Sequence, residues 1–173
     1  MTKKENIWRH ILHKALTERE LTFTQKGIAE EFKISTSTVF NALSIPRKIG
    51  AIEVRGRYFR LCDFEKLLLI WATARNLKND ISYSTFVPSG VREIEGSMPP
   101  DVIFGAFSAY RFAYNEEPAD YSAVYVYADD LEEIRRRFPK QKGSPNLFVL
   151  KPDQQLSSFG KTTPDVQTFA DLW

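Results

Sequence analysis

The chain has 173 residues but a single cysteine, Cys62, which excludes an internal disulfide and a zinc site built from several cysteines. Eight glycines and nine prolines are too few for a collagen-like or low-complexity chain. No stretch approaches the roughly 18 uninterrupted apolar residues of a membrane-spanning helix. Polar and charged side chains stand where a signal peptide would be apolar, so we expect a cytoplasmic protein. The remaining composition, 43% hydrophobic and 27% charged, is typical of a soluble globular chain.

Charge is divided unevenly along the chain. Residues 1–78 contain 15 Lys and Arg against 8 Asp and Glu, a net charge of +7, whereas residues 79–173 contain 9 against 14, a net charge of −5. This split predicts that only the first half faces a polyanion such as nucleic acid. Uneven scatter of charge along the chain is the alternative.

Hydrophobic periodicity predicts helices and a hairpin in the first half. Apolar residues at helical spacing indicate a helix over 6–18, a second over 25–32, and a third that Ser35 caps and Pro46 ends near residue 45. Alternation then predicts a β-hairpin, residues 51–54 and 58–61, around a glycine turn. Asp63 begins an apolar helix within 63–78 that we expect to connect the two halves. His10 and His13, on the first helix, are expected to be surface residues, not metal ligands.

The segment 25–39 resembles the core of winged helix-turn-helix regulators. At the matching positions, Ala29 allows two helices to approach closely, Ile34 fills the turn and Val39 anchors the recognition helix. Residues 49–52 resemble the run into the wing. The resemblance implies that residues 1–62 are a winged-helix domain whose third helix enters the major groove of double-stranded DNA.

Two groups of residues are therefore candidates for DNA binding. Side chains off the buried stripe of the third helix would meet base edges, and cations at its end and at the wing tip would neutralise phosphates. The first group is Thr36, Ser37, Phe40, Asn41 and Ser44, and the second is Arg47, Lys48, Arg55 and Arg57. Phe40 packed against the wing is an equal alternative, and a winged helix that binds protein is the alternative for the whole set.

The second half, residues 79–173, predicts a small α/β domain. Strands are expected over 81–87, 122–127 and 146–150, a tightly packed helix over 104–112, a polar turn with Pro118 over 115–120, a helix to residue 138 capped by Asp129 or Asp130, a loop over 152–163, and a last helix with Pro164 at its first position. The spacing from Gly105 to Asp120 resembles the nucleotidyltransferase signature. Ser122 replaces the second acid of that signature, so we expect no enzymatic activity, no metal and no cofactor.

Both halves together resemble prokaryotic, especially archaeal, regulators related to the AbiEi-type antitoxins of type IV toxin–antitoxin systems. The second-half residues that carry this resemblance are 107–110, 146–150 and 167–173. The resemblance implies a transcriptional repressor of α+β fold, with a winged helix followed by a nucleotidyltransferase-like domain. We therefore expect a homodimeric DNA-binding regulator whose residues 79–173 sense a signal or bind a partner protein. An antitoxin-like interaction protein and a divergent nucleotidyltransferase are the alternatives.

Overall fold

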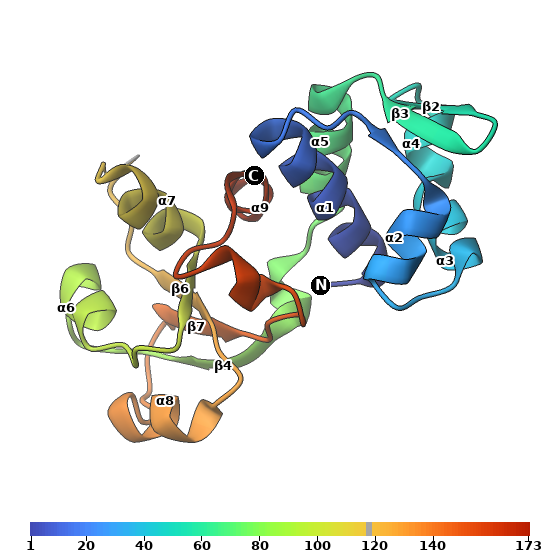
Figure 1. Cartoon of the computed structure of the whole chain (residues 1–173). Coiled ribbons are helices and arrows are strands. Elements are labelled where there is room, and N and C mark those ends of the chain that lie inside the picture. The colour runs from blue at the N-terminus through green and yellow to red at the C-terminus, as the bar shows by residue number, and fades with distance from the viewer. Residues whose placement is uncertain (117–118) are drawn as a thin grey trace. The chain divides into compact units, whose positions relative to one another are not determined.

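The computed structural model describes residues 1–116 and 119–173, and it confirms a mixed α+β architecture with two sheets. The chain divides into two compact units, Met1–Arg75 and Asn76–Leu172 (Figure 1). Each unit contains one sheet with helices packed on it.

Five helices belong to the first unit, and side chains cap four of them. Thr2, Thr24, Ser35 and Asp63 each accept a hydrogen bond from a backbone N–H of the first turn that follows, which satisfies a donor without a partner inside the helix. The helices are α1 (Lys3–Thr17), α2 (Gln25–Glu31), α3 (Thr36–Ala42), α4 (Ser44–Lys48) and α5 (Phe64–Ala74).

A three-stranded antiparallel sheet completes this unit. Its strands are β1 (Thr22–Phe23), β2 (Ile52–Arg55) and β3 (Tyr58–Leu61), in the order β1-β3-β2. Arg55 pairs with Tyr58, so the hairpin turn is the two residues Gly56 and Arg57. Gly56 has a φ of +60°, which glycine adopts without strain.

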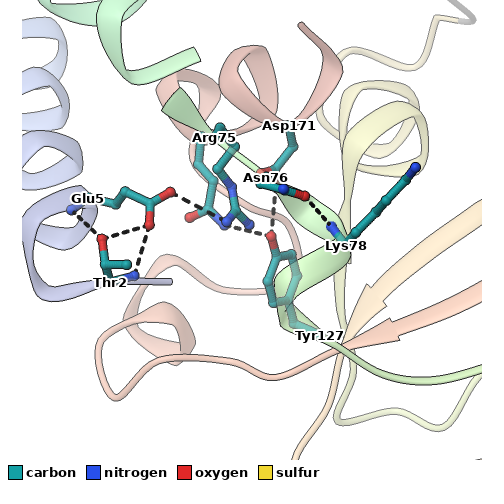
Figure 2. A network of polar contacts seen from close by, with 8 residues as sticks. Thr2, Glu5, Arg75, Asn76, Lys78, Tyr127 and Asp171 are labelled. Atoms are coloured by element: carbon teal, nitrogen blue, oxygen red, sulfur yellow. Dashed lines mark hydrogen bonds and ion pairs between the residues drawn. The ribbon is translucent and has the colours of Figure 1, made fainter. Parts of the chain in front are cut away.

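The core of the first unit joins α1, α3 and α5. Trp8, Leu43 and Trp71, one from each helix or its end, are fully buried, and α1 packs against both other helices. Figure 2 shows a second link: Glu5 completes a capping box with Thr2 and reaches Arg75, just after α5, at 3.5 Å. Both charged side chains are buried, so α5 is part of this unit's core.

The third helix ends earlier than the sequence predicts, at Ala42 rather than near residue 45. In one continuous helix Pro46 would clash with the carbonyl of Ala42 and leave it without its usual donor. The chain breaks at Leu43 instead, and Pro46 lies in the first turn of α4, where no N–H is needed. The Ala42 carbonyl accepts a hydrogen bond from the Trp8 indole at 2.9 Å.

The second unit is built on a four-stranded mixed sheet of order β4-β7-β6-β5. The parallel pair is β6–β7, and the other two pairs are antiparallel. The strands are β4 (Ile81–Thr85), β5 (Ile103–Gly105), β6 (Val124–Tyr127) and β7 (Leu147–Leu150); the helices are α6 (Val91–Gly96), α7 (Ala106–Tyr114), α8 (Leu131–Arg137) and α9 (Asp165–Leu172), with short 3-10 turns η1 (Leu77–Asp80) and η2 (Leu156–Phe159). Asp130 is the residue that caps α8.

Several predicted boundaries in this unit are wrong. The strand expected over 81–87 ends at Thr85, and the strand expected over 122–127 begins only at Val124. Phe104 and Gly105 belong to strand β5, because they pair with Val126 and Tyr125 of β6. Phe104 also exchanges backbone hydrogen bonds with Lys161 and Thr163, far along the chain. The helix begins only at Ala106. Pro164 precedes α9 and its carbonyl accepts the first helical bonds, and the predicted loop over 152–163 contains η2. In the predicted polar turn, Asn115 ends α7 with left-handed backbone, and Pro118 lies outside the described residues.

Candidate nucleic-acid interface

Helix α3 presents one polar face to solvent. Val39 and Ala42 are buried against α1 and α2, which fixes the rotation of the helix about its axis. The predicted base-facing residues Thr36, Ser37, Phe40 and Asn41 are all exposed, whereas Ser44, at the start of α4, is half-buried. Four of the five predicted residues thus lie together on one accessible face.

The turn between α2 and α3 sets where this face begins. Lys33 has a φ of +52°, and the Ile34 N–H bonds back to the carbonyl of Ala29 at 2.9 Å. Ile34 itself is half-buried, and Ala29 is buried in α2. The left-handed residue turns the chain between the two helices in only a few residues.

Three hydroxyl groups gather at the N-terminal turn of α3. The Ser35 hydroxyl caps the helix and lies 2.8 Å from the hydroxyls of both Ser37 and Thr38. Ser37 therefore has a partner within its own turn. Thr36 and Asn41 have exposed side chains that do not share in this cluster.

Phe40 is 47% exposed, and the side chain of Arg47 lies over its ring. The guanidinium carbon of Arg47 lies 5.2 Å from the centre of the Phe40 ring, within the range of a cation–π contact. The contact holds Arg47, from α4, beside the exposed face of α3. Lys48 is exposed next to it.

The hairpin tip is cationic, but one of its charges is partly neutralised. Arg55 and Arg57 are both exposed, and Arg55 lies 2.9 Å from the Glu53 carboxylate on the same strand. The hydrogen bond from Arg55 to Glu53 raises the pKa of Arg55. Within residues 1–116 and 119–173, Arg57 forms no ion pair, so it is the less compensated of the two cations. The alternation of β2 places Glu53 and Arg55 on one face, a pattern that could have revealed this pairing from the sequence.

His10 is not the surface residue that the sequence predicts, because only 10% of its side chain is exposed. Its ring meets Phe32 and Phe23 edge-on, at centroid distances of 5.4 and 6.2 Å. Phe23 lies in β1 and Phe32 just after α2, so segments that follow α1 in the sequence bury the His10 ring. This burial, with Lys14 nearby, lowers the pKa of His10 to about 4, and Nδ1 lies 3.2 Å from the Glu31 carboxylate.

The residues of the transferase-like trace belong to the second unit. Gly105 ends β5, and a β-carbon there would meet the Tyr127 ring at 2.9 Å, so close packing accounts for the glycine. Asp120 is exposed and lines a cavity of about 360 Å³ with Arg92 and Tyr121. No group of three or more His, Cys, Asp or Glu in the described part of the chain is placed to hold a metal ion.

Comparison with known proteins finds no matching family model, curated protein or solved structure. Of the helices that the structure describes, none has both the length and the apolar character needed to cross a bilayer.

Proposed function

We propose that the first unit is a winged helix-turn-helix that binds double-stranded DNA and that the protein regulates transcription, most simply as a repressor. The observation that carries the proposal is the exposed polar face of α3, bordered by Arg47 and Lys48. Short polar side chains such as Asn41 suit base edges in the major groove, and Arg57 at the hairpin tip suits a phosphate.

We expect one set of residues to read bases and another to contact phosphates. Asn41 and Thr36 are the most available base-reading groups, since the Ser37 hydroxyl is engaged by Ser35. Arg47, Lys48, Arg55 and Arg57 would contact phosphates. If all four did so, a plot of the logarithm of affinity against the logarithm of salt concentration would have a slope of about −3.6. A homodimer on a palindromic site would double that surface and slope.

Fluorescence anisotropy across a salt series, with the protein's own upstream DNA and a random duplex, tests this proposal. Arg57→Gln should weaken binding to both duplexes. It should also make the salt slope less steep by about 0.9 for each protein chain bound to the DNA. Glu53→Gln should strengthen binding to both, because it frees Arg55. Arg136→Gln, at a 75% exposed side chain on α8, is the matched control and should change neither. If Arg57→Gln and Arg136→Gln behave alike, the hairpin does not contact DNA.

Base reading has a separate test. Asn41→Ala should reduce the preference for the upstream duplex over the random one by about 1–3 kcal/mol. Thr73→Ala, an exposed change on α5, is the control. An equal loss on both duplexes would assign Asn41 to the backbone and reject α3 as the sequence-reading helix.

A second role, binding of a partner protein, is favoured by exposed aromatic side chains on the second unit. Phe112 and Tyr114 of α7 and Phe169 of α9 are 45%, 51% and 38% exposed, and the two helices pack together. Such rings are typical of protein interfaces. An antitoxin-like function requires a transferase-like toxin encoded by a neighbouring gene. Co-expression with that protein should give a complex, and Phe112→Ser should weaken it. If no complex forms, the antitoxin-like role is rejected.

A further inference from the structure

The solvent face of the three-stranded sheet holds a polar cavity that the proposed DNA contacts do not explain. Strand alternation buries Phe23 and Phe59, so their neighbours point outward. The register places Thr22 opposite Arg60. The cavity has a volume of about 390 Å³ and is lined by Arg19, Glu20, Leu21, Thr22, Arg55, Tyr58 and Arg60.

Positive charge is concentrated in this cavity. Three of its seven lining residues are arginines and one, Glu20, is an acid. Arg55 is paired with Glu53, but the guanidinium groups of Arg19 and Arg60 form no ion pair or hydrogen bond with the residues that the structure describes. The register also places Glu53 opposite Arg60, so this face has two acids, Glu20 and Glu53, against three arginines. The arginines remain in excess, and an anion bound among them would lower the local positive potential.

Arg19 occupies a position that favours glycine. It follows Glu18, the C-cap of α1, and has a left-handed φ of +59°. This arrangement terminates many helices and usually has glycine at the left-handed residue. The chain thus carries an arginine where glycine would be less strained, and that arginine lines the cavity. Backbone strain of this kind is common at binding sites.

We propose that this cavity binds a mononucleotide, with Arg19 and Arg60 on its phosphate and Tyr58 against its base. The planar fork of arginine matches phosphate oxygens in a bidentate way that lysine cannot. Tyr58 is 43% exposed and lines the cavity with the arginines, so its ring can stack on a base. The cavity volume of about 390 Å³ lies at the lower end of the range of roughly 300–1,000 Å³ for small-molecule sites, which suits a ligand as small as a mononucleotide.

Isothermal titration of the full chain with adenosine monophosphate, inorganic phosphate and adenosine tests the proposal. Adenosine monophosphate should bind at least about fivefold more tightly than phosphate, because the base adds a stacking contact. Arg60→Gln and Arg19→Gly should each weaken its binding about tenfold or more. Arg19→Gly should also raise the melting temperature, so its loss of binding would not reflect a damaged fold. Arg57→Gln, an exposed arginine on the same hairpin but outside the cavity, is the matched control.

Three results would overturn the proposal. One is the absence of binding of adenosine monophosphate at millimolar concentration. Another is an equal loss in Arg57→Gln and Arg60→Gln, which would indicate diffuse attraction rather than a site. The third is phosphate binding as tight as that of the nucleotide, which would remove the role of Tyr58.

The cavity and the proposed DNA interface share Arg55 but can fail separately. If the chain binds the nucleotide with this variant pattern but binds no duplex, only the DNA-binding function is rejected. If it binds duplex through Arg57 but no nucleotide, only the cavity proposal is rejected. If both hold, bound nucleotide should weaken duplex binding, because Arg55 lines the cavity and its charge would then lie near a second phosphate.

Discussion

The buried His10 predicts a specific loss of stability in mild acid. Its pKa is about 4 in the folded chain and about 6.5 in the unfolded chain, because burial against Phe23 and Phe32 disfavours the charged ring. Between these values the unfolded state binds the extra proton. Stability from a neutral His10 is therefore complete above pH 6.5 and declines as the pH falls toward 4. The full difference, 2.5 pH units, corresponds to roughly 3 kcal/mol.

Urea unfolding at a series of pH values from 4 to 7.5 measures this loss. Acid acts on the whole chain, so the quantity to follow is the difference in free energy of unfolding between wild type and His10→Gln, a variant that lacks the imidazole. That difference should shrink by roughly 3 kcal/mol from pH 7 to pH 4. A difference that stays constant over this range would refute the burial argument. So would a wild type that gains stability relative to the variant in acid, which would make the Glu31 contact dominant.

Local features of the first unit could be predicted from the sequence. Ser35 and Asp63 begin their helices as expected, because capping depends on a side chain and a backbone N–H only a few residues apart. The hairpin around Gly56 is local in the same sense. The exposure of Asn41 followed from helical periodicity alone.

Features that depend on distant contacts were not predictable in this way. The break at Leu43 needs an outside donor for the Ala42 carbonyl, and that donor is Trp8, 34 residues away. His10 is buried by Phe23 and Phe32, which are apolar in the sequence but have no periodic relation to α1. The periodicity of the sequence does not indicate which distant residues come into contact.

The cationic cavity illustrates why the candidate site was incomplete. Alternation along β3 indicates that Tyr58 and Arg60 share a face, but it does not show what lies beside them. That depends on the pairing of β1 with β3, which brings Thr22 opposite Arg60 and the end of α1 close by. The Arg55–Glu53 pair differs, because both residues lie on β2 and strand alternation alone places their side chains on one face.

The remaining predictions concern two residues with positive φ and one buried pair of charges. Lys33→Gly should raise the free energy of unfolding by about 1 kcal/mol, since φ is +52°, and Gly56→Ala should lower it by a similar amount, since φ is +60° and no atom lies near an added β-carbon; urea unfolding checks both, and equal signs would reject the reasoning. Glu5→Gln keeps a side chain that can cap α1 but removes the charge buried against Arg75, and it should cost about 3 kcal/mol. Arg75→Met should also destabilise, and the double variant should lose less than the two single losses together, because each single change leaves the other charge buried without this partner. If the losses simply add, the 3.5 Å pair does not hold α1 to the end of α5.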